Sequence, residues 1–512
     1  MAYGRRYPTD HPLAVLKRGP GPARLPQGGH IMMPATANLS AAPQPDTAAA
    51  KSLNVRLLIK WAISLLLPPL FLLLPESTGL DGRMKLFLVI TLWAVIVWGF
   101  NIISEVAVAM ALPILYVLAG LLPYKAAMSS WTDTLTIITL GGLILGHVVM
   151  HTGLTRRIAL WGVNCMGGSF VGLLGGMTFA VMIISPLVPS ITGKTILFGI
   201  IAIGLCDAMG FKARSREATL ICLGTFLAVT STKLCWLTGA GDVILPVSLM
   251  DKVTGKTTSW LTYALYNAVP GALYTVISVG LALLLLRAGG HSHMRATMQE
   301  QYRALPPMGL AEKKAAVILV VTVLLLLTEP LHHMPTAYVI FIMGLVNFLP
   351  GMGLINGKAF GSMNINIVFF INGCMSIGIC ANAIGMDAWM TERMLGLLHT
   401  DSLWTSSLIC YGIGVVINFL LTPVAAFVSL VGPITQMAQA MQVDPAILVH
   451  SFQYGLDQFV LPYEYAPFML AMGMGYIGFR DMALVMLVRM AVMAVFLGCV
   501  AVPFWMLVSG WL

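Results

Sequence analysis

Residues 169–210 read SFVGLLGGMTFAVMIISPLVPSITGKTILFGIIAIGLCDAMG, two apolar runs separated by a polar, helix-breaking hexapeptide. The first run, 169–188, is long enough for a membrane helix, which needs about 20 such residues. It stops at Pro189-Ser-Ile-Thr-Gly-Lys, and a shorter run follows at 195–210. Non-helical backbone at membrane depth persists only where it is buried in protein or lines a water-filled cavity. We therefore expect this interruption to line a path across the membrane.

Apolar stretches of similar length recur along the whole chain. Hydrophobic residues make up 58% of the 512 and charged residues 10%, far below the charged share of a soluble domain. This composition predicts an all-α polytopic membrane protein. The clear spanning candidates lie near 57–74, 86–103, 106–123, 169–188, 217–237, 262–286, 314–330, 336–350, 404–421 and 484–509. Shorter or interrupted apolar stretches lie at 136–151, 195–210, 366–382, 424–440 and 445–475.

Three interrupted stretches have a counterpart later in the chain, in the same order. The pairs are Leu140-Gly-Gly-Leu-Ile-Leu with Ile371-Asn-Gly-Cys-Met-Ser, Pro189-Ser-Ile-Thr-Gly-Lys with Thr422-Pro-Val-Ala-Ala-Phe, and Leu237-Thr-Gly-Ala-Gly-Asp with Tyr463-Glu-Tyr-Ala-Pro-Phe. Paired broken segments in two similar halves are typical of a secondary transporter whose site lies between inverted repeats. A bundle with ordinary Gly and Pro kinks is the alternative, and three matched pairs favour the transporter.

The chain divides into a tail, two halves and a linker. Residues 1–52 are rich in Pro, Gly and Ala without an apolar period, which predicts a disordered tail. The long polar stretch 287–313 separates the two halves. The expected parts are a first transmembrane half at 53–290, a linker at 291–313 and a second half at 314–512.

The charge distribution predicts orientation and compartment. Much of the net charge of +9 lies in the tail and in short loops, a pattern of cytoplasmic segments rather than of a nucleic-acid-binding surface. The tail, Arg156-Arg157 and the stretch from Lys212 to Arg216 are therefore expected on the cytoplasmic side. Short loops suit a bacterial inner membrane. Met32 and Met33 are alternative translation starts, because the sequence before them is unlike folded protein.

Four stretches carry further motifs. They are Ile103-Ser-Glu-Val-Ala-Val-Ala-Met-Ala-Leu-Pro, Gly141-Gly-Leu-Ile-Leu-Gly with Thr152-Gly-Leu-Thr-Arg-Arg-Ile-Ala-Leu, Pro189-Ser-Ile-Thr-Gly-Lys-Thr, and Leu461-Pro-Tyr-Glu-Tyr-Ala-Pro with Gly473-Met-Gly-Tyr-Ile-Gly-Phe-Arg-Asp. In this order, from about residue 57 to the end, the chain resembles the divalent anion/sodium symporter family of the ion-transporter superfamily. The second stretch is similar to the first hairpin of that family. The resemblance implies about eleven transmembrane helices, two re-entrant hairpins, alternating access of the elevator kind and a homodimer.

The chain departs from this family where the family binds sodium. There, a Ser-Asn-Thr motif in each half helps bind sodium and the substrate carboxylate. Here Ile191 replaces the first Asn, and the second motif reads Thr422-Pro-Val. The turns that follow, usually Thr-Pro-Pro-Asn, are Gly239-Ala-Gly-Asp and Tyr465-Ala-Pro-Phe. These changes remove side-chain oxygens that a sodium ion would use, so sodium coupling stays open and no other cofactor is expected.

Two intramembrane lysines are candidate anion ligands. Lys194 and Lys233 lie in apolar surroundings, where a lysine costs about 2.5–3.5 kcal/mol and so faces a cavity or a partner. One or both ammonium groups then stand where related proteins bind sodium. A branch of the family that exchanges carboxylates is similar in placing Arg at this position. A structural salt bridge, with Asp242 as partner, is the alternative for either lysine.

Hydroxyl and backbone groups complete the predicted anion site. Ser190, Thr192 and Thr195 supply hydroxyls, and the N-termini of half-helices favour anions. For each hydroxyl the alternative is a helix cap or a bond to the preceding turn. The predicted substrate-binding residues are Ser190, Thr192, Gly193, Lys194, Thr195, Lys233, Thr238, Gly239, Asn372, Thr422 and Pro423.

Acidic residues at membrane depth are candidates for coupling. Asp242 and Glu464 are the predicted coupling residues, with Asp457 a weaker candidate, because a buried carboxyl group can exchange a proton near neutral pH. Neutralisation of a lysine by Glu464 is the alternative. The i, i+4 pair His147 and His151 has zinc-compatible spacing but no intervening Glu, so we expect packing and no metal.

Arg489 lies inside the last apolar run and is expected either to snorkel to the membrane surface or to pair with another side chain.

The favoured function is a carrier of a small anion, such as a di- or tricarboxylate or a sulfate-like oxyanion. A cation/proton antiporter that uses Asp242 and Glu464 is the alternative, which two intramembrane lysines disfavour. An enzyme is not expected, because no Ser–His–Asp order or metal signature is present. The expected partners are the anion, the lipid bilayer and a second copy of the chain, with no nucleic acid.

Overall fold

The computed structural model describes residues 47–100, 102–166, 168–288, 294–363, 365–386, 388–390, 392, 402–419, 423–461 and 464–510. Every regular element among them is helical, so the prediction of an all-α protein is confirmed. By its contacts the chain forms two units, Met1–Arg56 and Leu57–Leu512. Residues 1–46 of the predicted disordered tail fall outside the described residues, whereas residues 47–52, which were also predicted to be disordered, begin a helix.

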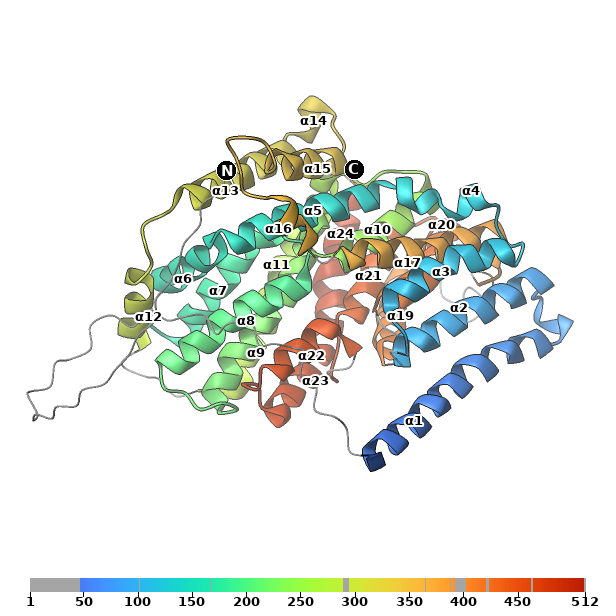
Figure 1. The fold of residues 1–512 in the computed structure, drawn as a ribbon, viewed down its shortest axis with the longest axis horizontal. Coiled ribbons are helices and arrows are strands. Elements are labelled where there is room, and N and C mark those ends of the chain that lie inside the picture. The colour runs from blue at the N-terminus through green and yellow to red at the C-terminus, as the bar shows by residue number, and fades with distance from the viewer. Residues whose placement is uncertain are drawn as a thin grey trace, which may run out of the picture. The chain divides into compact units, whose positions relative to one another are not determined.

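The helices, labelled in Figure 1, follow one another along the chain. The first are α1 Thr47–Leu66, α2 Gly82–Phe100, α3 Glu105–Leu118, α4 Tyr124–Ala127, α5 Thr134–His151, α6 Leu154–Met166, α7 Phe170–Ile184, α8 Ile191–Ala208, α9 Arg216–Thr232, α10 Gly241–Thr254, α11 Trp260–Leu286 and α12 Met294–Arg303. The others are α13 Leu310–Leu327, α14 Glu329–His332, α15 Thr336–Val346, α16 Gly357–Gly361, α17 Asn366–Ala383, α19 Leu403–Asn418, α20 Pro423–Ala440, α21 Pro445–Leu456, α22 Ala466–Gly473, α23 Phe479–Phe496 and α24 Val502–Ser509.

Several helices have the length and composition of membrane spans. Within the described residues five qualify, at Phe170–Leu187, Ile191–Ala208, Arg216–Cys235, Trp260–Leu286 and Phe479–Ser509, or six if the bent pair α5–α6 is one span. Shorter apolar helices lie at Leu57–Leu73, Val106–Leu118, Thr336–Val346, Val368–Ala383 and Leu403–Asn418. The chain is therefore a multi-pass membrane protein, whereas a total of about eleven spans stays a prediction.

One order of elements occurs twice, two consecutive helices and then a helix broken in its middle. The first copy is α7, α8 and the broken helix α9–α10, and the second is α19, α20 and the broken helix α21–α22. We call residues 185–190 tip 1, residues 233–240 break 1, and residues 457–465 break 2. In both copies the helix pair packs on the first part of its own broken helix.

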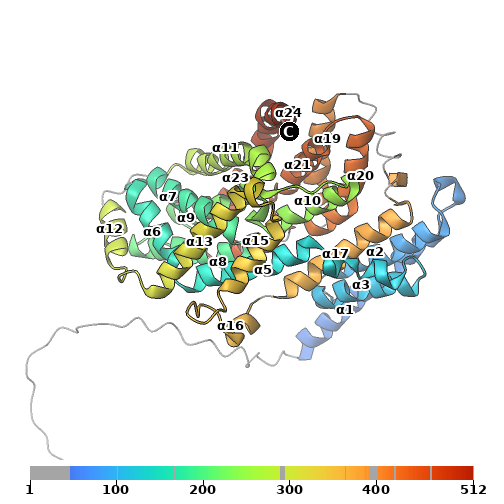
Figure 2. The same ribbon diagram turned by 90° about the horizontal axis from the view of Figure 1, so that it is seen from above.

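The two copies also exchange contacts. Helix α8 packs on α22 of the second copy, and α20 packs on α10 of the first, as Figure 2 shows for α10 and α20. Outside the copies, α5 packs on α15 and α17 on α3. Glycines permit these close approaches: a Cβ on Gly141 would lie 2.7 Å from Phe341 Cα, and one on Gly373 would lie 2.3 Å from the Ala109 carbonyl oxygen. Small residues at such crossings are typical of membrane helices.

The stretch that resembles the family's first hairpin, Gly141 to Leu160, forms α5 and α6. These helices meet at an angle of 64° next to Gly153, whose φ of +85° requires a residue without a Cβ. The turn that contacts break 1 is a different one, tip 1, which lies between α7 and α8. Gly141 lies inside the continuous helix α5, so the Gly-rich sequence at 141–146 contributes to helix packing, and the turn of this stretch lies at Thr152 and Gly153. A re-entrant hairpin at this stretch stays a prediction.

Candidate functional site

Tip 1 lies directly against break 1. The Thr238 hydroxyl donates a hydrogen bond to the Pro186 carbonyl, and the Gly241 amide donates to the Pro189 carbonyl at 3.2 Å. Backbone carbonyls of tip 1 are thus satisfied by donors at break 1, as non-helical backbone at membrane depth requires. The two motifs that the sequence singled out, Pro189-Ser-Ile-Thr-Gly-Lys and Leu237-Thr-Gly-Ala-Gly-Asp, are brought together.

Local chemistry fixes the shape of this contact. Ser190 caps α8 by accepting a hydrogen bond from the Gly193 amide at 3.2 Å. Gly239 has no room for a side chain, because an added Cβ would lie 2.1 Å from the Lys233 carbonyl oxygen. The indole of Trp260 donates to the Thr238 hydroxyl at 3.1 Å. The cap thus fixes the end of tip 1, and Gly239 and the Trp260–Thr238 bond fix the backbone of break 1.

Lys194 bridges the tip and the break through neutral oxygens. Its side chain is 1% exposed. The ammonium donates to Ser185 Oγ at 2.9 Å and to the Gly239 carbonyl oxygen at 2.6 Å. Within the described parts of the chain no carboxylate forms an ion pair with it. The salt-bridge alternative therefore finds no support at Lys194.

Break 2 is braced by an acidic side chain. The Glu464 carboxylate accepts hydrogen bonds from the amides of Val460, at 2.9 Å, and Leu461, at 3.1 Å. From the end of α19, Asn418 Nδ2 donates to the Gln458 carbonyl at 3.1 Å. Glu464 thus satisfies backbone donors that the interruption of the helix leaves open. A coupling role for Glu464 stays a prediction.

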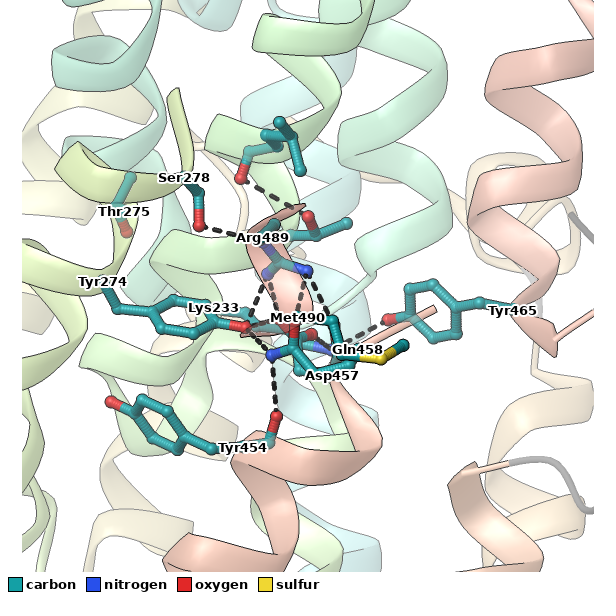
Figure 3. Close-up of polar contacts among 12 residues, drawn as sticks. Lys233, Tyr274, Thr275, Ser278, Tyr454, Asp457, Gln458, Tyr465, Arg489 and Met490 are labelled. Atoms are coloured by element: carbon teal, nitrogen blue, oxygen red, sulfur yellow. Dashed lines mark hydrogen bonds and ion pairs between the residues drawn. The ribbon is translucent and has the colours of Figure 1, made fainter. Parts of the chain in front are cut away.

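Lys233 joins the two breaks, as Figure 3 shows. Its ammonium lies 2.6 Å from Asp242 Oδ2 and 3.0 Å from Asp457 Oδ1. It also donates to the Tyr465 hydroxyl at 3.1 Å, and that hydroxyl lies 2.9 Å from Asp242 Oδ2. The salt-bridge alternative is what the structure contains for Lys233. Its ammonium is engaged on both sides, which leaves it less available to a substrate than the sequence predicts.

Arg489 of α23 reaches the same network from the opposite side (Figure 3). The guanidinium is fully buried and lies 2.7 Å from Asp457 Oδ2. It also donates to the Asp457 carbonyl at 2.9 Å, the Tyr274 hydroxyl at 2.6 Å and Ser278 Oγ at 3.0 Å. Arg489 therefore pairs rather than snorkels. The sequence missed its place at break 2, although a charge within an apolar run was a signal of function.

The charged groups around the breaks balance in number but are unevenly paired. The cations are Lys194, Lys233 and Arg489, and the anions are Asp242, Asp457 and Glu464. Glu464 makes its described bonds with the backbone of break 2 and with Asn418. Lys194 thus has no carboxylate partner among the described residues, and a buried ammonium without one attracts an anion.

The other predicted ligands fall into separate groups. Thr192 and Gly193 are half-buried in the first turn of α8. Thr195 is 3% exposed, and its hydroxyl has no hydrogen-bond partner among the described residues. Pro423 begins α20, and Thr422 lies outside the described residues. These positions remain candidates.

Asn372 makes its hydrogen bonds away from the breaks. It accepts one from the Thr136 hydroxyl at 3.1 Å and donates one to the Val368 carbonyl at 2.9 Å. These bonds place it where α17 meets α5. The histidine rings of His147 and His151 stack with centroids 3.8 Å apart. No cluster of three His, Cys, Asp or Glu side chains within the described ranges could hold a metal ion.

Comparison with known proteins gives several relatives. A "Membrane protein" of Cupriavidus necator is 26% identical over 59% of this chain and 63% of its own length. The L-tartrate/succinate antiporter of Escherichia coli is 22% identical over 69% of this chain and 75% of its own length. The chloroplastic dicarboxylate transporter 2 of Spinacia oleracea is 26% identical over 30% of this chain and 29% of its own length. The match thus spans less than two thirds of the Cupriavidus protein.

Among solved structures, the YdaH transporter of Alcanivorax borkumensis matches 80% of this chain and 97% of its own chain, with 15% identity and a TM-score of 0.49. A family model described as the sodium:sulfate symporter transmembrane region matches residues 52–511. That range holds tip 1 and both breaks, and the chain belongs to the sodium:sulfate symporter family.

Proposed function

We propose that this chain is a secondary transporter that exchanges small dicarboxylates or sulfate-like anions without sodium. The observation that carries the proposal is the position of Lys194. Its ammonium is held by one hydroxyl oxygen and one carbonyl oxygen, from Ser185 and Gly239. Carbonyl oxygens of unwound helices are the groups that coordinate sodium in secondary transporters. The ammonium then takes the place of a bound ion.

The geometry of the ammonium also favours anion binding. A lysine carries three N–H donors, and two are directed at Ser185 and Gly239. The third is then available to an anion at tip 1. Ser190, Thr192 and the amides at the start of α8 supply further donors, because a helix N-terminus favours negative charge.

A covalently fixed cation favours exchange over net uptake. A bound sodium ion leaves the empty carrier, whereas Lys194 stays in it. Moving one uncompensated charge through a membrane potential changes the energy by about 2.3 kcal/mol per 100 mV, and burying it costs more. The loaded carrier, in which an anion offsets the charge of Lys194, therefore crosses more readily. The printed name of the Escherichia coli relative, an antiporter of two dicarboxylates, agrees with this mode.

The cation/proton antiporter is the second candidate. It requires Asp242 and Glu464 to be available to an ion. Asp242 already pairs with Lys233 at 2.6 Å, and Glu464 accepts two backbone amides. These contacts support the anion carrier.

The arrangement in the cell is part of the proposal. We propose halves at 53–290 and 314–512, a linker at 291–313, alternating access about the two breaks and a homodimer. The basic loops support a cytoplasmic N-terminus in an inner membrane.

Uptake into proteoliposomes tests the proposal. Labelled succinate, tartrate and sulfate are offered to vesicles with or without internal unlabelled anion, in sodium or choline buffer. We expect uptake that requires internal anion, ignores sodium and falls at least about tenfold in Lys194→Ala, a loss of about 1.4 kcal/mol. Lys125→Ala, at an exposed lysine, is the control and should transport normally.

The opposite outcomes are distinct. Sodium-dependent uptake that survives Lys194→Ala would return the chain to the sodium symporters. Proton flux driven by a sodium gradient, with none of the anions moving, would identify the antiporter.

A further inference from the structure

A patch of basic side chains forms away from the breaks, where α6, α13 and α16 begin. The segments 141–166, 304–320 and 347–363 hold five basic residues and one acidic residue, so their net charge is +4 with the histidines neutral. The basic residues are Arg156, Arg157, Lys313, Lys314 and Lys358, and the acidic residue is Glu312. Three separate parts of the chain therefore contribute charge of one sign.

Packing holds these three segments together. Leu154, Ala315 and Ile355, one from each segment, are buried in the same small hydrophobic cluster. Next to it, Arg157 lies 3.0 Å from Glu312 Oε2 and donates a hydrogen bond to the Pro306 carbonyl at 2.6 Å. This ion pair joins α6 to α13 and uses the single carboxylate of the three segments.

The turn before α16 fixes the position of Lys314 but leaves its charge uncompensated. Gly351 and Gly353 have φ values of +92° and +59°, which favour a residue without a Cβ. The turn presents two backbone carbonyls to the Lys314 ammonium, which donates to that of Gly351 and, at 3.1 Å, to that of Met352. Both acceptors are neutral, so the positive charge of Lys314 remains in the patch.

Four cations of the patch are open to a ligand. The side chains of Arg156, Lys313 and Lys358 are exposed, and that of Lys314 is half-buried. None of the four forms an ion pair with a carboxylate in the part of the chain that the structure describes. Gathered positive charge of this kind raises the local concentration of anions. We call these four residues the basic patch.

Apolar and aromatic side chains flank the basic patch. Leu310, the first residue of α13, is 70% exposed, and Leu349, in the turn before α16, is 54% exposed. Helix α6 leaves the direction of α5 by 64° and carries Trp161, which is 42% exposed. Basic and aromatic side chains beside apolar ones are typical of the level of the lipid headgroups. An anionic head joined to apolar chains fits this combination better than a soluble anion does.

We propose that the basic patch binds the phosphate headgroup of an anionic phospholipid, with the acyl chains against the apolar side chains beside it. Clusters of four or more Lys and Arg next to membrane helices are the usual partners of such lipids. In the proposed orientation the patch fastens this part of the chain to the cytoplasmic leaflet. Helices α6, α13 and α16 contribute no residue to the ion pairs of the two breaks, so lipid binding does not rest on the proposed anion exchange.

The test measures lipid binding without transport. Purified protein in an uncharged detergent is titrated with phosphatidylglycerol, and bound lipid is counted by native mass spectrometry. We expect saturable binding that phosphatidylcholine with the same acyl chains does not reproduce and that added salt weakens. The double variant Arg156→Gln/Lys358→Gln should bind about 25-fold more weakly, because each basic side chain contributes about a factor of five. The control, Lys212→Gln/Arg216→Gln, removes two exposed cations elsewhere and should bind as wild type does.

Three outcomes would overturn the lipid site. Equal losses in the two double variants would show that the lipid responds only to the total charge of the protein. Equal binding of phosphatidylcholine would show that the headgroup charge is not recognised. Displacement of the lipid by inorganic phosphate, at the concentration at which the lipid itself binds, would identify a site for a soluble anion. Lipid binding as expected, in a protein that exchanges no anion in proteoliposomes, refutes the proposed transport and leaves the lipid site standing.

Discussion

Replacing Arg489 by methionine removes the guanidinium that holds break 2. Methionine keeps a long, flexible side chain at this position, so the change deletes hydrogen bonds without leaving a large cavity. Removing one partner of a buried ion pair costs about 3–5 kcal/mol, because the remaining charge is left uncompensated. Lys233, which lies 3.0 Å from Asp457, remains as a second cationic partner of that carboxylate. We therefore expect a loss of about 3–4 kcal/mol in the free energy of unfolding.

The assay is a denaturant titration in detergent micelles, followed by tryptophan fluorescence. Arg480→Met, at an exposed arginine of the same helix, is the control and should stay within about 0.5 kcal/mol of wild type. The double variant Arg489→Met/Asp457→Asn should lose less than the sum of the single variants, by about 0.5–3 kcal/mol, because the two groups are in contact. A single Arg489→Met variant as stable as the control would refute the assigned role.

Two further substitutions test break 1 and tip 1. Gly239→Ala would place a Cβ 2.1 Å from the Lys233 carbonyl oxygen, so it should lower the free energy of unfolding by at least about 1–3 kcal/mol and abolish exchange. The control Gly204→Ala, with nothing within 4 Å of its added Cβ, should change neither. Wild-type exchange by Gly239→Ala would contradict this. Ser190→Ala removes the cap of α8, so it should cost about 1 kcal/mol of stability in the same denaturant titration and weaken anion binding, measured by calorimetry, several-fold. Ser190→Thr keeps the hydroxyl and should retain both the stability and the anion affinity. Equal anion affinity in the alanine variant would show that the hydroxyl acts only as a cap.

The broken segments could be predicted because their cause is local. Pro189, Gly193 and Gly239 interrupt apolar runs, and backbone that leaves the helix at membrane depth must be satisfied by protein or water. The same reasoning expected tip 1 and break 1 in one site, and the structure places them in contact. Glycines were less informative, since Gly141 serves a crossing of helices.

Partner choice could not be predicted, because it depends on packing between distant segments. Arg489 and Asp457 are 32 residues apart, and only the docking of α23 on break 2 brings them within 2.7 Å. Glu464 was expected to face a lysine or a proton path, yet it is bonded to the backbone amides of its own break. An unwound segment has more donors to satisfy than its sequence reveals.

The ion pairs determine which helices can move separately. Lys233 bonds break 1 to break 2, and Arg489 bonds break 2 to α23 and, through Ser278, to α11. Separating these elements would leave buried charges unpaired, at a cost of several kcal/mol for each. In the proposed alternating access, a movement that exposes the site to either side would therefore carry both broken helices, α11 and α23 together. Helices α3, α5, α15 and α17 make none of these bonds. They would form the frame against which this group shifts, with close helix crossings at Gly141 and Gly373.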